Sequence, residues 1–180
     1  MMKVASAGKQ YRELMNAGTL RGITKDGNPL ALHMAMFIPA IMGQGTREQQ
    51  EKWLGRALKG EIIGTYAQTE LGHGTFLRGL ETRATYDPVK EEFVLHSPSV
   101  TAIKWWPGGL GKTSNYAVVM AQLYIDGKCF GPHPFMAQLR DERTHESLQH
   151  ISQGIQLTQS LPVLMQICTL HSTEHKNNRS

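Results

Sequence analysis

The stretch Gly64–Thr75 reads GTYAQTELGHGT and is the most distinctive part of the chain. The apolar pair Ile62 and Ile63 precedes it, which predicts the end of a buried strand followed by a loop. Gly72 and Gly74 have no Cβ, so the backbone there can approach a flat or charged ligand closely. The loop also carries hydroxyl, amide and carboxylate side chains. A strand that leads into such a loop is a common way to hold a cofactor.

A second unusual segment follows about 30 residues later, where Lys104–Thr113 reads KWWPGGLGKT. Its last three residues resemble the end of a P-loop, but that motif needs a glycine where this chain has Trp106. A dinucleotide fingerprint fails as well, because Gly79 lies two residues too far beyond Gly74. Neither of these common nucleotide motifs therefore explains the two segments.

Taken together with Arg78–Thr82 (RGLET), the two segments resemble the peroxisomal acyl-CoA oxidases, which are flavoenzymes related to the acyl-CoA dehydrogenases. The resemblance covers Pro29–Leu148 and implies a truncated or alternatively spliced chain of that family. It implies FAD as cofactor and oxidation of fatty acyl-CoA to trans-2-enoyl-CoA in fatty acid β-oxidation. In that reaction a glutamate removes the α-proton, hydride passes to the flavin, and dioxygen reoxidises the flavin to give hydrogen peroxide.

The resemblance also assigns individual residues. Thr69 and Gly108 match flavin-contacting positions, and Thr75 matches a position that faces the acyl-CoA. The catalytic glutamate of the family lies in a C-terminal helical domain, so we expect no catalytic residue in this chain. Glu70 and Glu81 lie near the flavin loop, but the family motif makes neither of them the base.

Each of these assignments has a simpler structural alternative. A loop threonine such as Thr69 often bonds its own backbone. Gly108 also fits a plain turn, an interpretation that is compatible with a flavin contact. Trp105 and Trp106 could pack on the flavin, although core packing is the more common role of a tryptophan pair. His73 has no catalytic partner in the sequence and is interpreted as a loop residue.

The sequence predicts an α+β fold in which helices precede strands. We expect helices over Ala7–Asn16 and Leu30–Met42, the second either kinked or broken into two pieces at Pro39. A capping box, Thr46-Arg47-Glu48-Gln49, predicts a third helix that runs to about Lys59.

The strands are expected to form hairpins. One hairpin pairs residues 83–86 with 93–96, and the other pairs 116–124 with 129–139 across Asp126-Gly127. This order matches the helical N-terminal part and a partial antiparallel middle β-barrel of the oxidase fold, with the C-terminal helical domains missing.

Three regions are therefore expected: a helical part over 1–60, a partial β domain with the flavin loops over 61–148, and a divergent tail over 149–180. The tail does not continue the family pattern and is predicted to be poorly ordered. One hypothesis is a family oxidase activity. The other is an inactive product that acts, if at all, by pairing with a full-length oxidase as a homodimer or heterodimer.

Composition sets broader limits. The chain has 180 residues, a formal charge of +4 and a pI near 9.1, a mild basic bias that suits phosphate-rich FAD or CoA as well as an ordinary solvated surface. Cys129 and Cys168 form no disulfide framework, and no metal-ligand spacing occurs. We expect no nucleic-acid partner and no membrane span, because the longest apolar run is too short.

The expected compartment follows from the family and is the peroxisome. The chain begins without the apolar core of a signal peptide, and it ends in Asn178-Arg179-Ser180 rather than a Ser-Lys-Leu import signal. A cytosolic location is therefore the alternative.

Overall fold

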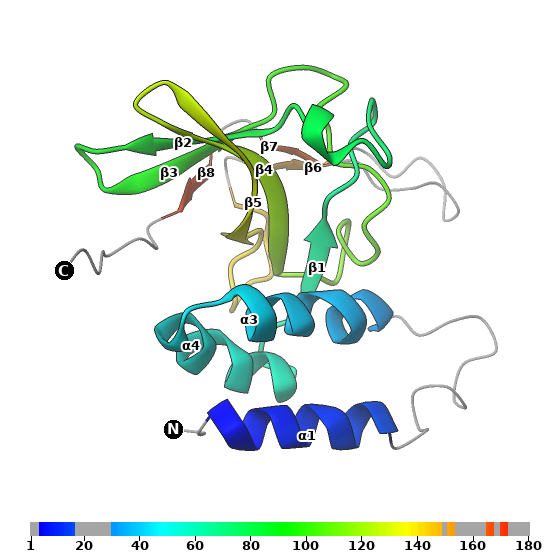
Figure 1. Cartoon of the computed structure of the whole chain (residues 1–180). Coiled ribbons are helices and arrows are strands. Elements are labelled where there is room, and N and C mark those ends of the chain that lie inside the picture. Colours follow the sequence, from blue (N-terminus) through cyan, green and yellow to red (C-terminus); the bar gives the residue numbers. More distant parts are fainter. Residues whose placement is uncertain (1–3, 17–29, 149–150, 154–164, 168–169, 173–180) are drawn as a thin grey trace.

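The computed structural model describes residues 4–16, 30–148, 151–153, 165–167 and 170–172, with helices first and strands after them, so the α+β fold class is confirmed. Figure 1 shows the helices gathered at one end of the sheet. The helical elements are α1 (Val4–Asn16), the π-helix η1 (His33–Phe37), α3 (Ile38–Gln44), α4 (Arg47–Leu58) and the 3₁₀ turn η2 (Leu77–Gly79). The strands are β1 (Gly64–Ala67), β2 (Arg83–Asp87), β3 (Glu92–His96), β4 (Tyr116–Ile125), β5 (Lys128–Gln138), β6 (Ile151–Gln153), β7 (Met165–Ile167) and β8 (Leu170–Ser172).

Helix α4 begins and ends as its sequence predicts. The Thr46 hydroxyl accepts the Gln49 amide at 3.3 Å, and the Gln49 side chain accepts the Thr46 amide at 2.9 Å, which confirms the capping box. At the other end Gly60 has a φ of +73°, and the amides of Gly60 and Glu61 turn back onto the last helical turn. This is the Schellman arrangement, which glycine favours because no Cβ opposes the positive φ.

The helix predicted over Leu30–Met42 forms, but the proline is accommodated by a π-turn. The Ile38 amide donates to the His33 carbonyl five residues back, so η1 precedes α3 and Pro39 falls in the first turn of α3. A proline near a helix start loses no hydrogen bond, because those amides lack intrahelical partners anyway. Phe37, Ile38 and Ile41 are buried on the inner face.

The sheet is mixed, which corrects the expectation of a purely antiparallel barrel. Its main path runs β1-β4-β2-β3-β8, and β5 pairs with the other edge of β4. Both β1 and β2 pair with β4 in parallel, one after the other along the same edge. The strand before the motif was also placed too early: β1 begins at Gly64, after Ile62 and Ile63, so the first third of the motif is itself the strand.

Both predicted hairpins are confirmed. Strand β2 pairs with β3 around a turn in which the Asp87 carboxylate accepts the amides of Val89 and Lys90. Strand β4 pairs with β5 across Asp126 and Gly127, which have φ values of +50° and +75°. Two positive φ values identify the tight turn whose twist matches that of the flanking strands.

Strand β4 contributes to two cores because alternate side chains point to opposite faces. On one face Ala117 and Val119 pack in a core with Leu95 and Leu139, which come from other parts of the β region. The opposite face packs against the helices. That second core contains Phe37, Ile38, Ile41, Trp53, Leu54, Ala57, Leu58, Ile62, Tyr116 and Val118.

His33 joins three elements in this second core. It is 3% exposed; its Nε2 donates to the Ala57 carbonyl at the end of α4, and its Nδ1 accepts the Gly64 amide at the start of β1, both at 3.0 Å. Burial lowers the pKa of His33 and outweighs the opposing effect of the Ala57 carbonyl, which favours the protonated ring. The neutral ring with hydrogen on Nε2 therefore matches its surroundings.

Most of the expected tail, residues 149–180, lies outside the described residues. Within it, β8 pairs antiparallel with β3, and β6 pairs with β7. The predicted poor order of the tail and the three-region division of the chain both stay predictions. None of the described helices is long and apolar enough to cross a membrane.

Candidate functional site

The two unusual segments lie side by side in the structure. The Leu71 amide donates to the Ile103 carbonyl at 2.8 Å, and the Trp105 amide donates to the Thr69 carbonyl at 2.9 Å. These bonds form an isolated antiparallel bridge between Glu70 and Lys104. Residues 34 positions apart in the sequence therefore form one irregular surface beside the ends of β1 and β2.

Thr69 lies at the centre of this surface. Its carbonyl is engaged by Trp105, but its half-buried hydroxyl has no hydrogen-bond partner in the part of the chain that the structure describes. A hydrogen bond from this hydroxyl to its own backbone, the simpler alternative, does not occur among the described residues either. A half-buried hydroxyl without an internal partner is suited to a ligand.

Gly108 is exposed, and its backbone is fixed by one hydrogen bond to β1. Its carbonyl accepts the Thr65 hydroxyl at 2.8 Å, while its amide has no acceptor among the described residues. A Cβ added at Gly108 would lie 3.2 Å from Leu32 Cδ1, so the glycine also allows this loop to pack against the helical part. The next residue, Gly109, has a φ of +77°, a conformation that glycine adopts without strain and a residue with a Cβ would not.

Trp106 is 70% exposed and has a φ of +78°, so the core-packing alternative is wrong for this residue. A bulky side chain at positive φ costs of order 1–3 kcal/mol and is tolerated where the surroundings enforce it, often at functional sites. Its indole has no ring partner among the described residues. Trp105 is half-buried.

Thr75 lies farther along the first loop and is exposed. No contact among the described residues brings its side chain to Thr69 or Gly108. Of the two loop glycines, Gly72 is explained by packing, because an added Cβ would lie 2.8 Å from Thr101. Gly74 has nothing within 4 Å of such an atom, so its surroundings are open.

His73 has a partner that the sequence did not indicate. Its Nε2 lies 2.9 Å from Glu81 Oε1, and the other Glu81 oxygen accepts the hydroxyls of Ser99 at 2.6 Å and Thr101 at 3.0 Å. These contacts, Ser99 first, lower the pKa of Glu81. Both oxygens of this carboxylate are therefore occupied, and the cluster braces the loop at Gly72.

Glu70 and Lys104 form a completely buried ion pair, with 2.9 Å between Oε1 and Nζ. The Glu70 carboxylate also accepts the amides of Glu81 at 2.7 Å and Thr82 at 2.9 Å. Burial lowers the pKa of Lys104 to about 8, against the opposing effect of Glu70, so the ammonium form still predominates at neutral pH. With every oxygen engaged, Glu70 is not available as a base.

Arg140 was also missed by the sequence interpretation. It is 4% exposed, and its guanidinium donates to the carbonyls of Leu110, Gly111 and Ser114. Several carbonyls of the second loop thus converge on one side chain. This convergence holds the loop beyond Gly109 without any regular secondary structure.

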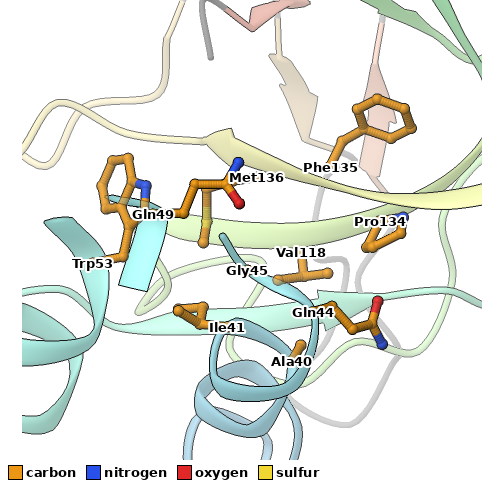
Figure 2. Close-up of a pocket in the computed structure, with 10 residues that line it drawn as sticks. All are labelled: Ala40, Ile41, Gln44, Gly45, Gln49, Trp53, Val118, Pro134, Phe135 and Met136. Atoms are coloured by element: carbon orange, nitrogen blue, oxygen red, sulfur yellow. The ribbon is translucent and has the colours of Figure 1, made fainter. Parts of the chain in front are cut away.

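A separate cleft, partly open to solvent, lies between α3, α4 and the strands β4 and β5 (Figure 2). Its floor is apolar, and the amide side chains of Gln44 and Gln49 stand at its edge. The lining residues are Ala40, Ile41, Gln44, Gly45, Gln49, Trp53, Val118, Pro134, Phe135 and Met136. It contains neither Thr69, Thr75 nor Gly108.

Comparisons with known proteins relate these helices and loops to the N-terminal region of acyl-CoA oxidases. A family model described as acyl-coenzyme A oxidase N-terminal matches residues 1–63. Acyl-coenzyme A oxidase acox-1.1 of Caenorhabditis elegans is 66% identical over 129 residues, which are 72% of this chain and 19% of that protein. Peroxisomal acyl-coenzyme A oxidase 1 of Bos taurus is 61% identical over 126 residues, 70% of this chain and 19% of the bovine protein.

Solved structures agree with the sequence relatives. The crystal structure of acyl-CoA oxidase-1 of Caenorhabditis elegans complexed with FAD and ATP superposes with a TM-score of 0.81 at 46% identity. The match covers 94% of this chain and 29% of that one. The chain is therefore similar to the N-terminal part of acyl-CoA oxidases, and it spans about a fifth of the length of the curated relatives it matches.

The residues present fit one side of a flavin site. Thr69 offers a hydroxyl and Gly108 an amide that have no partner in the described part of the chain, and Trp106 offers an exposed aromatic face. A planar, polar-edged ring system needs contacts of these kinds. Groups of three or more His, Cys, Asp or Glu side chains that could hold a metal ion do not occur among the described residues.

Proposed function

We propose that this chain forms the N-terminal helical and middle β parts of an FAD-dependent acyl-CoA oxidase. It supplies one wall of the flavin site through Thr69 and Gly108 and a substrate contact through Thr75. The observation that carries the proposal is the bridge between the two motif loops, which leaves the Thr69 hydroxyl and the Gly108 amide unpartnered among the described residues. When bound, FAD supplies the hydride acceptor for dehydrogenation of the fatty acyl-CoA and the route of electrons to dioxygen.

The 180 residues alone are expected to bind ligand without turning it over. The two carboxylates beside the loops, Glu70 and Glu81, have both oxygens engaged in hydrogen bonds and are poorly placed to remove a proton. One wall of a flavin site also buries only part of the ligand surface, which weakens binding by orders of magnitude. Addition of a fatty acyl-CoA to the FAD-treated chain should therefore give no hydrogen peroxide.

The Thr69 hydroxyl can be tested by an isosteric change. Thr69→Val removes the hydroxyl and keeps the branched shape, and the loss of one hydrogen bond to FAD should weaken binding about fivefold to tenfold. Thr85→Val is the matched control, because Thr85 is an exposed strand residue on β2. FAD affinity, measured by equilibrium dialysis, should fall only in the first variant. Equal affinities for the two variants would contradict the assignment of Thr69.

The substrate contact needs its own measurement. Thr75→Val should weaken binding of a fatty acyl-CoA to the chain while FAD affinity is retained, because Thr75 lies apart from the Thr69 bridge. Unchanged acyl-CoA affinity in Thr75→Val would remove this residue from the substrate site.

The peroxisome is the proposed compartment, supported by the bovine relative's name. Exclusive cytosolic fluorescence of the tagged chain would count against it.

Pairing with a full-length oxidase is the second candidate function. Large apolar side chains are exposed on and beside the motif loops, among them Phe76 at 64%, Val100 at 68% and Trp106 at 70%. Exposed apolar groups of this size favour contact with another protein surface. Co-expression with a full-length family member should yield a complex of defined stoichiometry, and the absence of any complex would argue against this role.

A further inference from the structure

The edge of β4 that faces β1 and β2 has a gap. Residues 116–119 of β4 pair with β1, and residues 122–124 pair with β2. Met120 lies between the two ladders, and its carbonyl points toward a place where no strand supplies a donor. The chain between β1 and β2 leaves the sheet at this point and forms the loop that carries Thr69 and Thr75.

Lys104 fills this gap with its ammonium group. Its Nζ donates to the Met120 carbonyl at 2.7 Å, to the Gln68 carbonyl at 3.1 Å and to Glu70 Oε1 at 2.9 Å. Three acceptors match the three hydrogens of an ammonium group. The side chain is 0% exposed, so water does not compete for these bonds.

Glu70 extends the contact to the far end of the loop. Its carboxylate accepts the amides of Glu81 and Thr82, the two residues before β2. The Thr82 hydroxyl in turn donates to the Ala102 carbonyl at 3.1 Å. The buried pair thus connects the exit from β1, the entrance to β2, the middle of β4 and the start of the second motif.

The energetics favour a geometric role for this pair. Removing two charges from water costs several kcal/mol for each ion, and a well-packed apolar pair of similar volume is often as stable. What an apolar pair could not do is fix the four backbone segments through directed hydrogen bonds. Thr69 lies between Gln68 and Glu70, and Trp105 directly follows Lys104, so both ends of the flavin surface are attached to this pair.

We propose that Lys104 and Glu70 are positioning residues that hold the Thr69 loop and the Trp105–Gly108 loop in register for flavin binding. The inference rests on the proposed function for its ligand, but the placement of the loops can be tested without FAD. Neither residue touches the ligand in this account. Both act through the backbone of residues 68–70, 81–82 and 104–105.

The test uses the whole chain and three variants. Lys104→Met removes the three donors at similar volume. Glu70→Gln keeps the size of the side chain but presents an NH₂ group where an oxygen now accepts a backbone amide. Lys90→Met is the matched control, because Lys90 is an exposed lysine in the β2–β3 turn. Amide hydrogen exchange, thermal unfolding and FAD affinity by equilibrium dialysis are measured for each.

We expect faster exchange of the amides at 71, 81, 82 and 105 in Lys104→Met and Glu70→Gln, with FAD affinity at least about tenfold weaker per folded molecule. Lys90→Met should change neither. If Lys104→Met fails to fold, the milder Glu70→Gln decides the question. A lower unfolding temperature with unchanged FAD affinity of the folded fraction would overturn the proposal, because it would make the pair purely structural.

Failure of the proposed function gives a different result. If the unaltered chain binds no FAD, the flavin assignment fails for these 180 residues. The exchange data then decide the placement of the loops: faster exchange confined to the four amides supports it, and unchanged protection overturns it.

Discussion

At Gly64 the helical part and the sheet approach each other closely. A Cβ placed there would lie 2.2 Å from the ring of Phe37, which is 0% exposed. Gly64→Ala should therefore destabilise the fold by about 1–3 kcal/mol or more, because the ring has no free space to enter. Urea unfolding measures the change directly.

Gly43 supplies the matched control for this change. It lies in helix α3 and has nothing within 4 Å of an added Cβ, so Gly43→Ala should stabilise the chain by about 0.5–1 kcal/mol. Opposite signs for the two alanine substitutions are expected. A stable Gly64→Ala variant would mean that Phe37 can repack, and the contact would not be tight in solution.

Single residues were predictable from the sequence only where their partners are near in the chain. Thr46 and Gln49 are three positions apart, and capping is local, so the spacing alone identified their contact. The contact of His73 with Glu81 forms only once the loops have folded. The same holds for the hydrogen bonds of Arg140 to carbonyls about 30 positions away. No periodicity marks such contacts. The positive φ of Trp106 likewise depends on the surrounding loop rather than on the residue type.

Among the elements, η1, α4 and β1 meet at His33, and this junction should be sensitive to acid. The pKa of His33 is lowered by burial below its ordinary value of 6.5, so between the folded and unfolded pKa values the unfolded chain binds the extra proton. Stability is then fully present above about pH 6.5 and is lost as the pH falls through the folded-state pKa. Protonation also removes the lone pair that accepts the Gly64 amide.

Urea unfolding at about pH 7.5 and about pH 5.5 tests this junction. His33→Gln should lose less stability on acidification than the unaltered chain, although its stability at the higher pH is lower. His133→Gln, a change at an exposed histidine on β5, should leave the pH dependence as it is. Parallel pH profiles for all three proteins would exclude His33 as the cause.

Elements with local signals were predicted well, and those set by distant pairing were not. The capping box, Gly60 and Asp126-Gly127 mark the ends of α4 and the turn between β4 and β5 through short-range chemistry. The parallel pairing of β1 and β2 with β4 joins segments about 40–50 positions apart, and hydrophobic alternation does not distinguish it from antiparallel pairing. The strand end predicted at Ile63 was also wrong, because β1 runs from Gly64 to Ala67.

At the scale of the whole molecule, the helices and the sheet are joined by one apolar core and by polar contacts beside it. The Glu142 carboxylate accepts hydrogen bonds from Arg56 on α4 and from Tyr116 on β4. Arg56, then Tyr116, lowers the pKa of Glu142. These contacts attach helix α4 to strand β4. Composition and motif resemblance predicted the α+β class and the family, whereas the partnering of the loops required the fold.

The most direct test of the account is equilibrium dialysis of FAD against the purified chain, with visible flavin absorbance measured on both sides. Saturable binding of one FAD per chain is expected, weak enough to be lost on desalting and weaker still in Thr69→Val, because these residues supply one wall of the proposed site. Equal flavin concentrations on both sides, with a chain whose circular dichroism shows it to be folded, would contradict the claim that the Thr69 and Gly108 loops bind the cofactor.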